Sequence, residues 1–180
     1  MSDGSPILSS EALDTLLDRL TDDLIAASMA DAAFIGVYTG GAHLAARLVD
    51  RIAARGHQRP KLGTMDITMY RDDLYTGLEK PILGDTDIPF NVTGQRIVLV
   101  DDVLFTGRTI HAALRQMMDY GRPRSVSLLV LIDRGHRELP IGADFVGQIV
   151  DTGKRDKVVV KLIESGASID GVDLIPQREG

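Results

Sequence analysis

The sequence contains no cysteine. Disulfides, thiolate metal sites and thiol nucleophiles are therefore excluded, and redox chemistry at sulfur is excluded with them. The opening MSDGSPILSS lacks the basic start and apolar core of a signal peptide, and no stretch approaches the roughly 18 consecutive apolar residues of a membrane span. We therefore expect a cytoplasmic protein without a membrane partner.

Basic residues are also scarce relative to acidic ones, which gives a formal net charge of −6 and a pI near 5.1. Such a chain has no global attraction to nucleic acid, although a local basic face is still open. With 180 residues, 44% of them hydrophobic, it is long enough for one buried core and too short for two ordinary domains. No repeat, low-complexity tract or linker divides it. We expect a single domain over residues 1–180.

Apolar runs that alternate with amphipathic segments predict the fold class. Leucines at three- and four-residue steps over 13–24 indicate a helix that Ser10 can cap, and further helices are expected at 42–56 and up to about Tyr120. Strands are expected at 33–38, 62–70, 97–102, 125–132, 143–150 and 157–164. Strands alternating with helices predict an α/β domain with a mostly parallel sheet. The polar stretch 71–95 has the length of a functional or disordered loop.

The stretch IVLVDDVLFTGRTI, residues 97–110, carries the chemistry. In an open parallel sheet, ligands bind beyond the carboxyl ends of the strands, and Asp101 and Asp102 stand at such an end. The next turn directs backbone amides at a helix N-terminus, where a phosphate is favoured, and Gly107 lets the backbone approach it. Two carboxylates would repel that phosphate, so they should face sugar hydroxyls or hydrated Mg²⁺. The stretch suits a ligand with a phosphate and a ribose diol.

No other nucleotide-binding loop competes with this interpretation. The chain has no G-x-x-x-x-G-K-[ST] motif, and no G-x-G-x-x-G follows any expected strand. The four histidines, at His43, His57, His111 and His136, do not have metal-ligand spacing, and we assign none of them a catalytic role.

The stretch VLVDDVLFTGRT resembles the phosphoribosyl-pyrophosphate (PRPP) signature of type I phosphoribosyltransferases. Three more stretches, GVYTGGAHLA (36–45), DITMYRDDL (66–74) and DRGHRELPI (133–141), resemble the bacterial pyrimidine operon attenuation regulators that are also uracil phosphoribosyltransferases. The similarity extends over roughly residues 33–165 in matching order and spacing. It implies a type I phosphoribosyltransferase fold, a mostly parallel central sheet flanked by helices with a small base-binding hood.

The resemblance also implies the site. Its catalytic residues would be Asp101, Asp102 and Arg71, and both aspartates would meet Mg²⁺ through Mg–PRPP. Residues 71–95 would form a flexible catalytic loop that closes over the substrates. PRPP and its phosphates would bind at Thr39, Gly40, Gly41, Val103, Leu104, Phe105, Thr106, Gly107, Arg108 and Thr109. The base would lie against Arg134, Phe145, Val146 and Gly147.

The turn at 38–41 departs from the family pattern. Many members carry a basic residue there, whereas this chain has Tyr38 and Gly40 at the corresponding positions. Contacts to pyrophosphate must then rely more on backbone amides and Mg²⁺, and Arg71 is the side chain that we would place against pyrophosphate. The implied reaction joins uracil N1 to C1 of PRPP, which releases pyrophosphate and gives uridine 5′-monophosphate (UMP). It needs no protein nucleophile, in agreement with a chain without cysteine or an evident Ser-His-acid constellation.

Other functions stay open. The family's second activity is binding of a leader mRNA hairpin, but Arg19 is the single basic residue among the many acids of residues 1–31. Basic patches could instead come from Arg51, Arg55, Arg59 and Lys61, or from Lys154, Arg155 and Lys157. A non-catalytic nucleotide-sensing regulator and a transferase for hypoxanthine, guanine or orotate are the alternatives, and DRGHRELP weighs against another base. Relatives form homodimers that assemble further.

Overall fold

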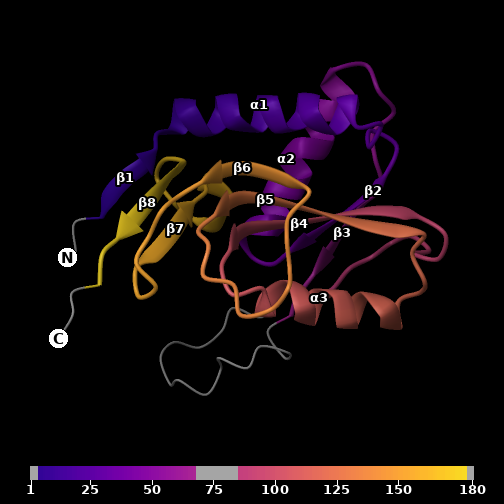
Figure 1. Cartoon of the computed structure of the whole chain (residues 1–180). Helices are drawn as coiled ribbons and strands as arrows, with labels where there is room; N and C mark the ends of the chain where they lie inside the picture. Colours follow the sequence, from indigo (N-terminus) through magenta and orange to yellow (C-terminus); the bar gives the residue numbers. More distant parts are fainter. Residues whose placement is uncertain (1–3, 68–84, 178–180) are drawn as a thin grey trace.

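The protein is described by a computed structural model that covers residues 4–67 and 85–177 (Figure 1). Its centre is a five-stranded sheet in which every neighbouring pair of strands is parallel, in the order β3-β2-β4-β5-β6. The strands are β2 (Ala33–Val37), β3 (Leu62–Met65), β4 (Arg96–Leu104), β5 (Ser125–Asp133) and β6 (Phe145–Ile149). The prediction of a mostly parallel α/β sheet is confirmed.

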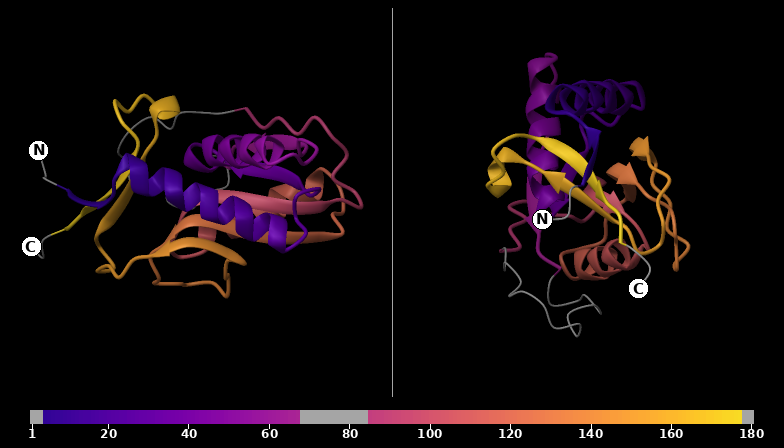
Figure 2. Two further views of the ribbon diagram at one scale, coloured as in Figure 1. Left: turned by 90° about the horizontal axis from the view of Figure 1, so that it is seen from above. Right: turned by 90° about the vertical axis from the view of Figure 1, so that its left-hand side faces the viewer.

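Helices cover both faces of this sheet. The helices α1 (Ser10–Ala26) and α2 (Gly40–Ala54) lie on one face, and α3 (Arg108–Asp119) lies on the other (Figures 1 and 2). Residues alternate between the two faces, so Phe34 and Val98 pack under α1 and α2, whereas Ile35 and Ile97 pack against α3. Burial on both faces explains why β4 and β5 are continuous apolar runs.

The helix limits differ slightly from the predicted ones. Ser9 rather than Ser10 caps α1, because the Ser9 hydroxyl accepts a hydrogen bond from the amide of Ala12. The second helix starts at Gly40 instead of residue 42, so both glycines of the Thr-Gly-Gly turn belong to its first turn. That places a helix N-terminus directly behind β2.

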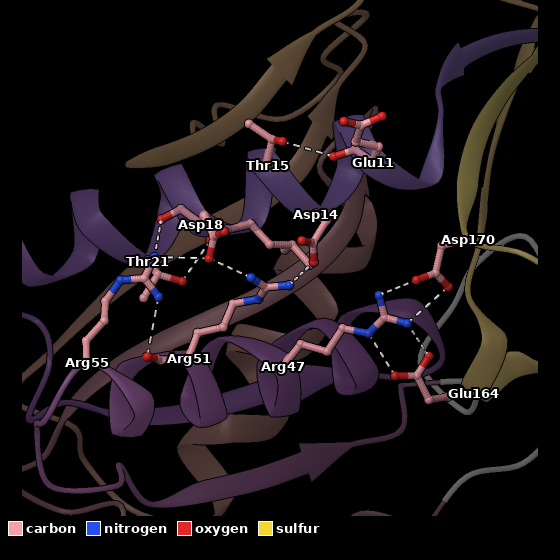
Figure 3. Close-up of polar contacts among 11 residues, drawn as sticks. Glu11, Asp14, Thr15, Asp18, Thr21, Arg47, Arg51, Arg55, Glu164 and Asp170 are labelled. Carbon is pink, nitrogen blue, oxygen red and sulfur yellow. Dashed lines mark hydrogen bonds and ion pairs between the residues drawn. The ribbon is translucent and has the colours of Figure 1, made fainter.

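A second, antiparallel sheet of three strands was not foreseen as a unit. Its strands are β1 (Ser5–Leu8), β8 (Gly171–Ile175) and β7 (Lys157–Lys161), in the order β1-β8-β7. The short helix η3 (Ile163–Ser165) joins β7 to β8. Arg47 of α2 contacts both Glu164 and Asp170 and thereby ties this small sheet to the main one (Figure 3).

The predicted loop 71–95 is described only at its second end. Asp87 pairs with Thr64 beside β3, and Val92 is fully buried, so residues 85–95 pack against the sheet. Residues 71–84, including Arg71, lie outside the described residues. Over the described part of the chain, no helix is both long enough and apolar enough to cross a membrane.

Candidate active site

Two carboxylates lie at the carboxyl end of the central strand. β4 runs through Asp101 and Asp102 to Leu104, two residues further than the sequence predicts. Asp101 is only 5% exposed, and its Oδ1 accepts the amide of Asp102 at 2.9 Å. Oδ1 of Asp102 accepts the amide of Val103 at 2.8 Å. These bonds help to fix the orientations of the two carboxylates.

The loop after β4 leads into the N-terminus of α3. Gly107 has φ of 90°, a left-handed conformation that favours glycine, and an added Cβ would lie 3.0 Å from Ile141. The amides of Gly107 and Thr109 have no acceptor within residues 4–67 and 85–177. Unpaired amides at a helix N-terminus, together with the helix dipole, form an anion site. The loop therefore has the geometry of a phosphate cradle.

The turn between β2 and α2 packs directly on the acidic pair. A Cβ added to Gly40 would lie 2.7 Å from Cγ of Asp102. A Cβ on Gly41 would overlap the carbonyl oxygen of Val100 and lie 2.9 Å from Cα of Asp101. Glycine at both positions allows the N-terminus of α2 to lie against the end of β4. Thr39 and Gly40 consequently face the same space as Asp102.

A buried cation lies beside this space. Arg134 is 6% exposed, and its guanidinium stacks 4.0 Å above the ring of Phe105. Its Nε donates to Oγ1 of Thr152 at 3.3 Å and its Nη2 to the carbonyl of Gly153 at 2.9 Å. Burial lowers the pKa of Arg134, and Asp156 partly offsets the shift. The guanidinium is held in one orientation by these contacts.

His136 completes the packing around Phe105. The two rings meet edge to face with centroids 5.9 Å apart. Nε2 of His136 lies 2.7 Å from the carbonyl oxygen of Thr152, which requires that nitrogen to carry the proton. The backbone of His136 has a left-handed conformation with φ of 59°. His136 is therefore engaged in structure.

One cavity of about 570 Å³ unites these features. The sequence-predicted residues that line it are Thr39, Gly40, Asp101, Asp102, Val103, Leu104, Phe105, Thr106, Gly107, Arg108, Thr109 and Arg134. A cavity of this size, with polar groups converging at the carboxyl edge of a parallel sheet, is typical of a small-molecule site.

Other predicted residues lie elsewhere. Gly41 is buried under the end of β4 and does not line the cavity. Phe145, Val146 and Gly147 do not line it either, because the register pairs Phe145 with Leu129, four residues before the carboxyl end of β5. At about 3.3 Å per residue, that is roughly 13 Å from the edge.

The β6 segment instead contacts α1, where Arg19 donates to the carbonyls of Val146 and Gly147. Residues that the sequence did not single out occupy the site instead. Thr152, after β6, contacts both Arg134 and His136, and His111 and Arg115 of α3 line the cavity. The Asp-Thr-Gly run at 151–153, directly after a strand, was the available signal for Thr152.

The basic residues of α2 that could have formed a nucleic-acid face are engaged within the chain. Arg51 pairs with Asp14 and Asp18 of α1, and Arg55 pairs with Asp18 (Figure 3). Arg55 also pairs with Asp22. These contacts form an ion-pair ladder that joins the two helices. Arg59 likewise pairs with Asp50, and Lys154 with Glu138.

Comparisons with known proteins agree with this geometry. Residues 6–164 match the family described as phosphoribosyl transferase domain. The chain is 45% identical over 171 residues to the bifunctional protein PyrR of Halalkalibacterium halodurans, covering 93% of each protein. It is 42% identical over 179 residues to the PyrR of Bacillus velezensis and 41% identical over 179 residues to that of Bacillus subtilis, with 97% of each protein covered.

Solved structures share the fold at low identity. The hypoxanthine-guanine enzyme of Leishmania tarentolae, in complex with GMP, aligns with a TM-score of 0.73 at 16% identity, over 98% of this chain and 99% of that one. A hypoxanthine phosphoribosyltransferase from Staphylococcus aureus gives 0.70 at 18%, over 96% and 92%. The type I phosphoribosyltransferase fold expected from the resemblance is confirmed. The chain belongs to the phosphoribosyl transferase domain family and, within it, to the bifunctional PyrR proteins.

Proposed function

We propose that this protein is a uracil phosphoribosyltransferase that forms UMP and pyrophosphate from uracil and PRPP. The observation that carries the proposal is the convergence of an acidic pair, an amide-rich helix N-terminus and a buried arginine on one cavity of about 570 Å³. Their chemistry matches a ribose diol, a 5′-phosphate and a base in that order.

The 5′-phosphate would bind the loop from Thr106 to Thr109. The free amides of Gly107 and Thr109 and the dipole of α3 favour a dianion, and the Thr109 hydroxyl adds a donor. Asp101 and Asp102 would accept hydrogen bonds from the two ribose hydroxyls. Their separation along β4 from the phosphate loop prevents the repulsion that a carboxylate next to phosphate would cause.

Pyrophosphate would lie toward Thr39 and Gly40, at the N-terminus of α2. No basic side chain belongs to that turn, so backbone amides and the helix dipole provide its own positive potential. Arg71 is our further candidate for this leaving group, from outside the described residues.

Mg²⁺ fits the acidic pair. No group of three or more His, Asp or Glu side chains could hold a metal within the described ranges, 4–67 and 85–177. Mg²⁺ commonly binds through one or two carboxylates together with substrate phosphates, a donor set that Asp101 or Asp102 plus PRPP would complete. When bound, Mg²⁺ would neutralise charge that develops on the departing pyrophosphate.

The reaction needs orientation more than proton transfer. Uracil N1 bonds to C1 of the ribose as the bond from C1 to the pyrophosphate oxygen breaks, and the N1 proton passes to the departing pyrophosphate or to water. The transition state resembles an oxocarbenium ion, so the site must hold both partners in line and stabilise negative charge on the leaving group. The paired aspartates fix the ribose, and the amide loop fixes the phosphate.

Arg134 is our candidate for reading the base. Its Nε and Nη2 are used by Thr152 and Gly153, whereas its remaining nitrogen has no acceptor in residues 4–67 or 85–177. A fixed guanidinium that lines the cavity favours a carbonyl acceptor such as those of uracil over an amino group. Phe105 would provide the apolar surface on which the Arg134 guanidinium rests.

The test is UMP formation from PRPP, Mg²⁺ and uracil, with orotate, hypoxanthine and guanine assayed in parallel. We expect turnover with uracil alone. Turnover with hypoxanthine or guanine in place of uracil would show that the assignment of uracil as the base is wrong. Binding of UMP without turnover of any base would instead support a nucleotide sensor.

RNA regulation is the second activity implied by resemblance, and the α1–α2 face gives it little support. The arginines that would contact RNA phosphates are held by aspartates of α1. RNA binding depends on basic groups that can replace counterions on phosphates. We propose that any leader mRNA contact uses another surface. We also propose that the protein assembles as a homo-oligomer, as the resemblance to its family implies.

A further inference from the structure

Arg137 reaches from the loop after β5 to the loop after β4. Its Nη1 donates to the carbonyl oxygen of Phe105 at 2.8 Å and approaches that of Leu104 at 3.4 Å. These two residues directly precede the loop proposed to hold the 5′-phosphate. The guanidinium does not itself line the cavity.

The same guanidinium is anchored on its own loop. Nε donates to the carbonyl of Ile141 at 3.0 Å, Nη1 also contacts the carbonyl of Gly135 at 3.1 Å, and Nη2 pairs with the carboxylate of Asp133. Burial alone would raise the pKa of Asp133, yet hydrogen bonds from Arg137 and the Gly135 amide hold that pKa below its ordinary value of 3.8. Asp133 is therefore a firmly ionised partner at neutral pH.

Neighbouring amides act in the same direction as Arg137. The amide of Arg134 donates to the carbonyl of Leu104 at 3.1 Å, and those of Glu138 and Leu139 donate to the carbonyl of Thr106 at 3.0 and 3.1 Å. The carbonyls of residues 104–106 thus all point toward the loop after β5. Because each peptide unit is planar, turning the carbonyls that way leaves the next amides directed to the other side. The free amide of Gly107 follows directly from this arrangement.

We infer that Arg137 is a positioning residue for the 5′-phosphate loop, acting through the carbonyls of Leu104 and Phe105. The inference rests on the proposed function, since it assigns the loop a phosphate. The fork of a guanidinium is needed, because Ile141, Phe105 and Asp133 are reached from three separate nitrogens, Nε, Nη1 and Nη2, whereas lysine has all its donors on one nitrogen. Lysine at this position keeps the charge and loses the geometry.

The experiment compares Arg137→Lys with Arg47→Lys by calorimetric binding of UMP, uridine and inorganic pyrophosphate. Arg47 is a matched control, because it also joins two parts of the chain through several hydrogen bonds but lies away from the phosphate loop. The ratio of the Kd of uridine to that of UMP measures what the 5′-phosphate contributes. We expect that ratio to fall about tenfold or more in Arg137→Lys, with affinity for pyrophosphate unchanged.

Arg47→Lys should keep the wild-type ratio even where it lowers the melting temperature. An unchanged ratio in a folded Arg137→Lys protein would overturn the inference, and so would an equal fall in Arg47→Lys, which would mean general loosening. Arg137→Met serves as a second variant in which the charge is also removed, and it should show at least the same fall. A wild-type protein that does not prefer UMP to uridine and makes no UMP would instead refute the proposed function.

Discussion

Gly40→Ala is the substitution for which the structure predicts the sharpest separation of activity from stability. Gly40 is the first residue of α2, and a methyl group there would lie 2.7 Å from Cγ and 2.8 Å from Cβ of Asp102. Ordinary carbon–carbon contacts lie near 3.5–4.0 Å. The Asp102 side chain must therefore move by about 1 Å to accommodate the methyl group.

The cost should fall on catalysis. Misplacement of a positioning group by about 1 Å can cost about 100-fold in rate, which corresponds to about 2.7 kcal/mol of transition-state stabilisation. The fold should tolerate the change, because a methyl group in the first turn of a helix gains about 0.5–1 kcal/mol in backbone entropy that offsets the crowding. We expect the free energy of unfolding to change by about 1 kcal/mol or less.

Two other glycines provide controls. Gly41→Ala would press on the backbone of β4 at Val100 and Asp101, which cannot rotate away, so we expect a loss of about 1–3 kcal/mol in stability. A methyl group on Gly142 would have no atom within 4 Å and should leave both properties unchanged.

The assay is UMP synthesis under saturating uracil with PRPP varied, combined with denaturant unfolding of each variant. Gly40→Ala with wild-type kcat/KM for PRPP would refute the assignment of Asp102 to the ribose. A loss of activity that was proportional to the loss of stability across all three variants would refute the predicted separation of activity from stability.

Three further predictions concern charges. Arg47→Met should lower the free energy of unfolding by about 1–3 kcal/mol, measured by urea unfolding, because it leaves Asp170, with a side chain 12% exposed, without its cation. Arg47 holds the pKa of Asp170 below its ordinary 3.8. The ion pair therefore stabilises the fold above that pH, and this stabilisation is lost as pH falls through the lowered pKa. Between pH 6 and pH 2, the free energy of unfolding of Arg47→Met should consequently change less with pH than that of the wild type. Arg134→Gln should lower kcat/KM for uracil by about 10- to 100-fold with the KM for PRPP unchanged, as steady-state assays would show. Asp14→Asn with Asp18→Asn should free basic groups of the α1–α2 ladder and give RNA retention that weakens as salt rises, in filter binding at 50 and 200 mM salt.

Each of these has a clear contrary result. Wild-type stability in Arg47→Met would mean that the small sheet is held mainly by its apolar contacts. Selective loss of PRPP affinity in Arg134→Gln would move that arginine from the base to the phosphates. RNA retention by the double variant Asp14→Asn with Asp18→Asn that is no stronger than that of the unaltered protein would contradict the view that the ladder closes this face.

The features predicted correctly are those whose signal is local in sequence. The strand and turn from Ile97 to Thr109 combine an apolar run, two carboxylates and a glycine at the left-handed position, and each has a direct physical reading. The helix α1 follows from leucine spacing in the same way. Because β4 and β5 are buried on both faces of the sheet, each contains a continuous apolar run that predicts a strand.

The features that were missed depend on pairing between distant parts of the chain. β1 and β8 are short strands joined through partners such as Ser5 and Leu174, and neither has a strong pattern of its own. The position of Phe145 follows from the register of β6 on β5, which no local pattern encodes. The same holds for the stacking of Arg134 on Phe105 and for the contacts of Arg137. The sequence identifies residues 106–109 as the proposed phosphate loop, whereas the contacts around that loop appear only in the tertiary structure.

UMP formation by the wild-type protein and by the double variant Asp101→Asn with Asp102→Asn tests the central claim most directly. Both proteins would be supplied with PRPP, Mg²⁺ and uracil, and product would be quantified by chromatography. The proposed site predicts UMP from the wild type and a loss of about 100-fold or more in the folded variant. No UMP from the wild type, or equal rates from both proteins, would contradict it.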